Sequence, residues 1–163
     1  MSKELCYAVY QLNVGDQISL TQSCEKSGNQ SHYEHHAIIS GDVGDGSRVQ
    51  VIHATGVTRS SVPPKSFSSS FVGAGPSCAG VAGLSHSLSG QVSTAYWDLR
   101  KYVAQQRLHM YRYYNCYPAQ TTIQLARSKI GPFDFDIKWN NCEHFARWCK
   151  TGRGTSEQAA SAP

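Results

Sequence analysis

One cysteine stands where a helix is predicted to begin. Asn140 and Asn141 precede Cys142, and asparagine is a favoured N-cap, so we predict a helix from Cys142 to about Lys150. The positive end of a helix dipole favours a thiolate and can lower the pKa of a cysteine below its usual value of about 8.5. Unpaired backbone N–H groups at that end can also receive an oxyanion. The position therefore suits a nucleophile for acyl transfer.

A thiol nucleophile needs a base, and the histidines are the candidates. His144 is nearest in sequence, but two residues along a helix it points away from Cys142, so we interpret it as a surface or supporting group. Period-two alternation places His35 on one face of a predicted strand and His36 on the other, and only one of them can face the site. His53 ends the returning strand, where it can lie beside His35 and complete a Cys–His–His arrangement.

The elements that must position these residues alternate between strand and helix patterns. The predicted strands are 17–20, 35–40, 48–53, 108–114 and 133–137, and the predicted helices are 96–103, 119–130 and 142–150. A turn at residues 44–46 joins the two histidine-bearing strands into a hairpin, and a polar loop is predicted after residue 20.

A long segment from about residue 56 to 94 is rich in Ser, Gly and Ala and poor in large apolar residues. We expect a surface loop there, either disordered or acting as a lid or a binding loop. The rest of the chain is long enough to enclose one core. We therefore predict a single domain over residues 1–152 and a flexible tail over residues 153–163.

Three segments of the chain resemble the lecithin:retinol acyltransferase family. They are Tyr33-Glu34-His35-His36-Ala37-Ile38-Ile39-Ser40-Gly41-Asp42, Val51-Ile52-His53 and Asn141-Cys142-Glu143-His144-Phe145. The resemblance implies an α+β, permuted papain-like fold, shared with NlpC-type thiol peptidases. In that fold an antiparallel sheet packs on helices and the nucleophile lies at a helix N-terminus.

The resemblance also assigns roles to residues. Cys142 becomes the nucleophile, His35 the general base and His53 the third member, while His36 occupies a position where relatives often carry a packed aromatic ring. Asn141, Glu143 and His144 become the residues around the oxyanion and the nucleophile.

Family members transfer fatty acyl groups from phosphatidylcholine to retinol or amines, or hydrolyse phospholipids as A1/A2-type lipases. The implied partners are a phospholipid acyl donor and an alcohol, amine or water acceptor. The implied chemistry needs no metal and no organic cofactor.

Composition also limits the kinds of partner and the location that can be expected for the protein. The formal charge of +4 comes from scattered Lys and Arg, which suits a peripheral membrane surface and argues against nucleic acid. No apolar run approaches the roughly 18 residues of a membrane span, so we expect a cytoplasmic or peripheral protein. The six cysteines include no CxxC pair, which argues against a zinc site.

Two alternatives remain beside an acyltransferase or phospholipase. The histidine box and Asn-Cys motif also resemble the 2A proteins of some small RNA viruses, which implies a non-catalytic interaction or regulatory module. A thiol peptidase or amidase is the second alternative, because thioester chemistry also serves amides. The presence of all three polar residues, Cys142, His35 and His53, favours an enzyme.

Overall fold

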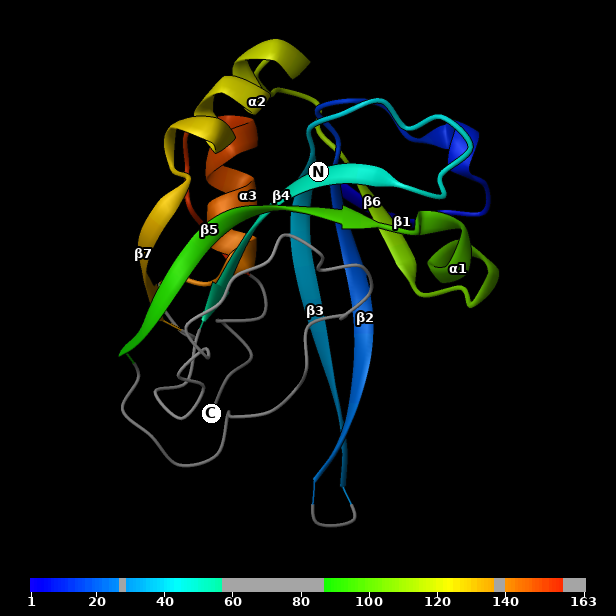
Figure 1. The fold of residues 1–163 in the computed structure, drawn as a ribbon, viewed down its shortest axis with the longest axis horizontal. Coiled ribbons are helices and arrows are strands. Elements are labelled where there is room, and N and C mark those ends of the chain that lie inside the picture. Colours follow the sequence, from blue (N-terminus) through cyan, green and yellow to red (C-terminus); the bar gives the residue numbers. More distant parts are fainter. Residues whose placement is uncertain (27–28, 57–86, 137–139, 157–163) are drawn as a thin grey trace, which may run out of the picture.

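The computed structural model describes residues 1–26, 29–56, 87–136 and 140–156. Within these residues one antiparallel sheet has the strand order β1-β6-β2-β3-β4-β5-β7 (Figure 1). Its strands are β1 (Ser2–Leu5), β2 (Gln17–Lys26), β3 (Asn29–Ile39), β4 (Val49–Gly56), β5 (Ser87–Trp97), β6 (Leu108–Arg112) and β7 (Gly131–Asp136). The helices are α1 (Leu99–Ala104), α2 (Ala119–Ser128) and α3 (Cys142–Thr151), with a 3-10 turn η1 (Val9–Gln11). The predicted α+β class, with an antiparallel sheet and helices, is confirmed.

The helices gather at opposite ends of the sheet. In Figure 1, α2 and α3 lie together beside β7, whereas α1 and η1 lie at the other end. Helix α3 packs on β3 and β4 as well as on α2. None of the helices in the described residues is long and apolar enough to cross a bilayer.

Alternation along β3 divides the core into two clusters. Ala37 and Ile39 pack with Val51 and Trp97 in one cluster. Ile38 faces the other way and packs with residues of α3, including Phe145. The predicted alternation is confirmed, and it places the adjacent histidines of this strand on different faces of the sheet.

The ladder between β3 and β4 is short. The strands pair only at Ile38↔Ile52 and Ile39↔Val51, whereas β2 and β3 pair from Gln17↔Ile38 to Lys26↔Asn29. The histidine-bearing part of β3 therefore has β2 as its ladder neighbour and is not hydrogen-bonded to β4. The first turn of α3 lies at this part of β3.

Two predicted loops are strands instead. The polar segment after residue 20 continues β2 to Lys26, because β2 and β3 form a long hairpin arm that extends past the helices (Figure 1) and is held by its own ladder. Residues 87–94, predicted as loop, belong to β5, while residues 57–86 of that segment lie outside the described residues.

The glycine in β5 has a packing reason. A Cβ added to Gly90 would lie 2.6 Å from Phe135 Cβ and 2.7 Å from Thr55 O, so the neighbouring strands approach too closely for a side chain.

The helix predicted over 96–103 is shorter than expected. Tyr96 and Trp97 end β5, and Asp98 caps α1 by accepting a hydrogen bond from Lys101 N.

Candidate active site

Cys142 is the first residue of α3, as predicted. Asn141 caps the helix, because its Oδ1 accepts hydrogen bonds from Glu143 N (2.9 Å) and His144 N (3.1 Å). His144 returns the contact, since its Nδ1 accepts from Asn141 N at 3.2 Å. Asn141 thus takes two of the N–H groups that we expected to be open to an oxyanion, which leaves the Cys142 N–H as the candidate donor of this turn. Asn141 and His144 together fix the start of the helix.

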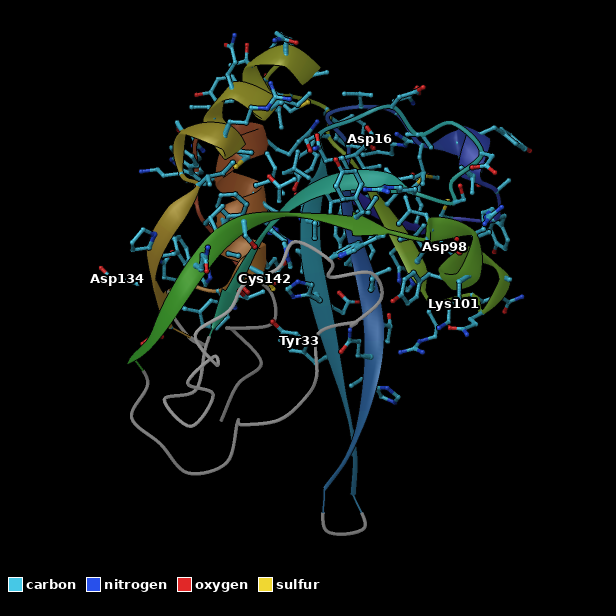
Figure 2. The ribbon with its side chains drawn as sticks, viewed as in Figure 1. Asp16, Tyr33, Asp98, Lys101, Asp134 and Cys142 are labelled. Carbon is cyan, nitrogen blue, oxygen red and sulfur yellow. The ribbon has the colours of Figure 1, made fainter. Side chains whose placement is uncertain are left out.

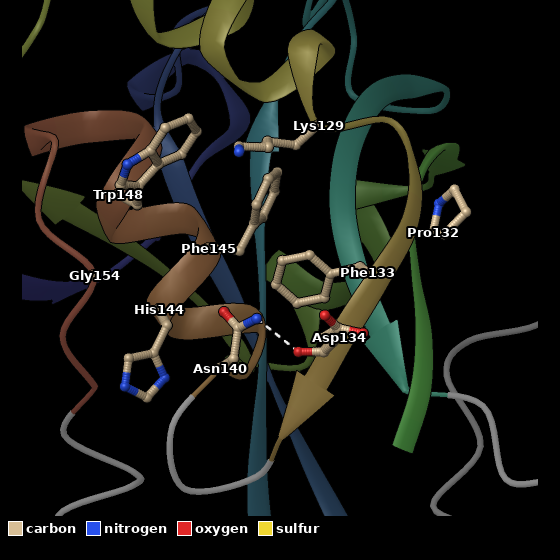
Figure 3. A pocket seen from close by; sticks show the side chains of 9 residues that line it. All are labelled: Lys129, Pro132, Phe133, Asp134, Asn140, His144, Phe145, Trp148 and Gly154. Atoms are coloured by element: carbon tan, nitrogen blue, oxygen red, sulfur yellow. Dashed lines mark hydrogen bonds between the residues drawn. The ribbon is translucent and has the colours of Figure 1, made fainter. Parts of the chain in front are cut away.

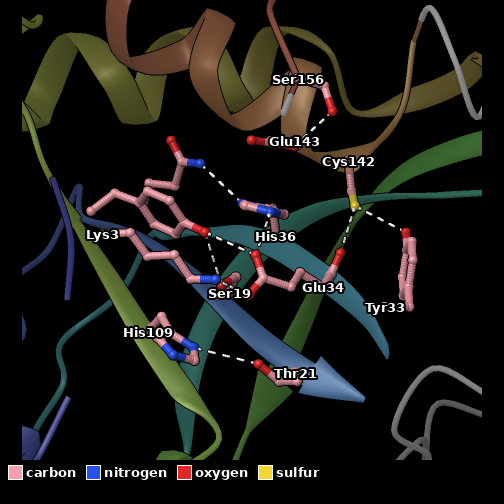
Figure 4. Close-up of polar contacts among 12 residues, drawn as sticks. Lys3, Ser19, Thr21, Tyr33, Glu34, His36, His109, Cys142, Glu143 and Ser156 are labelled. Atoms are coloured by element: carbon pink, nitrogen blue, oxygen red, sulfur yellow. Dashed lines mark hydrogen bonds and ion pairs between the residues drawn. The ribbon is translucent and has the colours of Figure 1, made fainter. Parts of the chain in front are cut away.

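The Cys142 thiol is enclosed by the residues before the histidines. Its Sγ lies 3.1 Å from Tyr33 Oη and donates to the backbone oxygen of Glu34 at 3.6 Å (Figures 2 and 4). The cysteine is 0% exposed. Burial raises the pKa of Cys142, although the backbone of His36 and the Tyr33 hydroxyl act to lower it. The prediction of a lowered pKa is therefore wrong for this closed arrangement, because desolvation outweighs the helix end.

His35 and His53 form a buried pair. His35 Nε2 lies 2.7 Å from His53 Nδ1, and both rings contact Trp97, with centroids 5.7 and 5.6 Å away. Burial lowers the pKa of His35 well below its usual value and that of His53 to about 4. Both rings are therefore neutral near pH 7, and one N–H donates to the bare nitrogen of the other. The predicted placement of these histidines side by side is found.

No hydrogen bond joins Cys142 to the histidine pair within the described residues. Among the described residues, the Cys142 thiol bonds to Tyr33 Oη and Glu34 O and interacts with the backbone of His36, and it has no hydrogen bond to the ring of His35 or His53. Tyr33 spans the interval, since its ring centroid is 6.3 Å from that of His35 and its hydroxyl contacts Sγ. The structure brings His35 and His53 together and adds Tyr33 between them and the cysteine.

His36 belongs to a different polar group on the α3 side of the sheet. It is fully buried, its Nδ1 accepts from Gln17 Nε2 at 3.0 Å, and its ring packs 5.2 Å from that of Tyr111. Its Nε2 lies 3.8 Å from Glu34 Oε2, and the other oxygen of that carboxylate, Oε1, binds Lys3 (Figure 4). Burial lowers the pKa of His36 to about 3. A packed, neutral ring agrees with the interpretation of this position as structural.

Sequence reasoning missed Tyr33 and Glu34 as neighbours of the thiol. Tyr33 lies two residues before His35 on the same strand, and that spacing is a signal which places both side chains on one side. The contact between Glu34 O and Cys142 had no such signal, because a backbone oxygen is the same in every residue.

The described pocket lies on the outer side of α3 and away from this chemistry. It has a volume of about 390 Å³ and lies between α3, β7 and the end of α2 (Figure 3). Its lining residues are Lys129, Pro132, Phe133, Asp134, Asn140, His144, Phe145, Trp148 and Gly154. Cys142, His35 and His53 are not among these lining residues.

Comparison with known protein families identifies one family. The family model described as lecithin retinol acyltransferase matches residues 10–155, a span that includes Cys142 and both paired histidines. No curated protein and no solved structure matches the chain.

Proposed function

This chain belongs to the lecithin retinol acyltransferase family, and we propose that it acts on phospholipid acyl groups through a thioester on Cys142. One observation carries the proposal: the buried His35, paired with His53 of β4, lies on the strand whose Tyr33 and Glu34 hold the thiol. The proposed activity is acyl transfer or A1/A2-type phospholipid hydrolysis, at a membrane surface, in a single domain with a permuted papain-like arrangement.

The paired histidines define which atom is the base. If His35 Nε2–H donates to His53 Nδ1, the Nδ1 of His35 carries the lone pair that takes a proton. His53 then carries its own proton on Nε2, which faces Ser93 Oγ at 3.5 Å. This tautomer assigns one role to each ring: His35 moves the proton, and His53 orients the ring of His35.

The reaction has two balanced halves. In the first, Cys142 Sγ gives its proton to His35 Nδ1 and forms a C–S bond with the acyl carbon. The ester C–O bond breaks, and His35 returns the proton to the departing oxygen of the lysophospholipid. In the second, an alcohol, amine or water gives its proton to His35 and attacks the thioester. The C–S bond breaks, and the thiolate is reprotonated.

The closed thiol requires one movement before the first half. Cys142 is fully buried and held by Tyr33, whose side chain is half-buried and lies next to His35. We propose that the entering acyl group displaces the Tyr33 hydroxyl, and that Sγ then turns to His35. The Cys142 N–H at the start of α3 is the proposed donor to the oxyanion.

The same contact favours a second candidate function. A buried thiol without a hydrogen bond to His35 is what a non-catalytic interaction module would also have, because nothing in such a module must activate the sulfur. The two candidates differ in whether lipid turnover depends on Cys142.

Turnover of phosphatidylcholine vesicles tests the proposal. We expect the wild type to release lysophospholipid, and to form an acylated product when an alcohol or amine is added. Cys142→Ala should abolish both. Cys149→Ala is the matched control, since Cys149 is buried on the same helix and burial raises its pKa to about 12. Turnover that survives in Cys142→Ala contradicts the proposal, and a wild type without turnover favours the interaction module.

A further inference from the structure

The chain after α3 returns to the first turn of that helix. Ser156 Oγ accepts from Asn141 Nδ2 at 3.1 Å and donates to Glu143 Oε2 at 2.6 Å (Figure 4). The adjacent Thr155 Oγ1 accepts from Arg147 Nη1 at 3.3 Å. These contacts connect a segment that was predicted to be a loose tail with both neighbours of Cys142.

The contact with Asn141 fixes the orientation of the helix cap. A side-chain amide can turn its oxygen and nitrogen ends around, and only the oxygen can accept from the N–H groups of α3. Ser156 accepts from the nitrogen end, so the oxygen end stays directed at Glu143 N and His144 N. The first turn, with Cys142 in it, is held in place by this arrangement.

The contact with Glu143 counters a buried negative charge beside the thiol. Glu143 is 2% exposed, and its Oε1 lies 2.9 Å from Arg147 Nη2. The charge of Glu143 raises the pKa of Cys142. A hydroxyl that donates a hydrogen bond to this carboxylate offsets part of its negative charge. The charge of Glu143 therefore acts less strongly on the sulfur of Cys142.

We infer that Ser156 is a positioning residue for Cys142, acting through Asn141 and Glu143 at the start of α3. The inference rests on the proposed use of Cys142 as the nucleophile. Loss of the Ser156 hydroxyl releases the Asn141 amide and leaves the Glu143 charge less compensated, and both changes disfavour the thiolate.

The pH dependence of Cys142 alkylation by iodoacetamide tests this role. Peptide mass spectrometry separates Cys142 from Cys116, whose exposed, free thiol is the internal reference. We expect Ser156→Ala to move the alkylation midpoint upward by about half a pH unit, a roughly threefold loss of thiolate at neutral pH. Ser156→Thr, which keeps the hydroxyl, should restore the midpoint. Ser128→Ala is the control, because within the described residues its exposed hydroxyl donates to the nearby Leu125 O.

A purely structural role would give a different result. If Ser156→Ala lowers the melting temperature and leaves the alkylation midpoint unchanged, the inference is wrong. Glu143→Gln supplies a second test, since adding Ser156→Ala to it should shift the midpoint less than in the wild type, and an equal shift overturns the inference. Alkylation needs no lipid, so failure of the proposed lipid chemistry is seen separately.

Discussion

His35 Nε2 and His53 Nδ1 lie 2.7 Å apart on two strands that pair at only two positions further along. The β3–β4 hairpin brings the rings together, and Trp97 from β5 packs against both of them. The pair leaves Nδ1 of His35 as the proposed base.

Removal of each ring should therefore have a different cost. We expect His35→Ala to lower the rate of lysophospholipid release by about 10²–10⁴-fold, the usual contribution of a general base. His53→Ala should cost less, and His53→Asn less still, because an amide can accept the hydrogen bond from His35. His109→Ala is the control, since that half-buried ring lies on β6 near Thr21. An unchanged rate in His53→Ala would contradict the orienting role.

Tyr33→Phe tests the hydrogen bond to the thiol. The hydroxyl lies 3.1 Å from Cys142 Sγ and acts to lower the pKa of the thiol, so we expect its loss to raise that pKa. Alkylation of Cys142 should then have a higher pH midpoint, and the free energy of unfolding should fall by about 1 kcal/mol.

Tyr111→Phe is the matched control for this test. It removes a buried hydroxyl that bonds to Ser19 and Glu34 side chains and not to the thiol. An equal pH shift in both variants would mean that Tyr33 acts through general packing and not through its contact with Cys142.

Acid should destabilise the fold through the buried histidines. The pKa is about 3 for His36 and about 4 for His53, and that of His35 is well below 6.5, whereas each is near 6.5 when the chain unfolds. Between pH 6.5 and about 4 the unfolded chain binds more protons, so the free energy of unfolding falls as pH falls, by roughly 1 kcal/mol per pH unit for each histidine. Below the folded pKa values this loss levels off.

Urea unfolding at pH 7.5 and pH 5 measures this dependence. The variant His36→Phe removes one of the three histidines, so its free energy of unfolding should fall less between the two pH values than that of the wild type. An equal loss of unfolding free energy in the two proteins would show that His36 does not contribute to the pH dependence.

Short-range patterns predicted the elements of the site well. The Asn-Asn-Cys order predicted the cap and start of α3, and both are found. Period-two alternation predicted that His35 and Ile39 share a face, and that His53 can meet His35 across the hairpin. These features depend on neighbours in sequence or on one strand pair, so local periodicity was sufficient.

The rest depends on contacts between distant segments. Burial of Cys142 results from the packing of α3 on β3, and this packing reverses the pKa shift that the helix end alone suggests. Ser156 was predicted to be tail, because its partners Asn141 and Glu143 are reached only when the chain turns back. Strand β5 was not predicted because its sequence is rich in Ser and Gly. The pairing of this strand with β4 and β7 cannot be inferred from composition.

Intact-mass spectrometry after incubation with phosphatidylcholine vesicles tests the central claim most directly. We predict that the wild type gains the mass of one fatty acyl group, that His53→Ala gains it more slowly, and that Cys142→Ala does not gain it. Absence of the adduct from the wild type, with Cys142 alkylated no faster than the buried Cys149, would contradict the thioester mechanism.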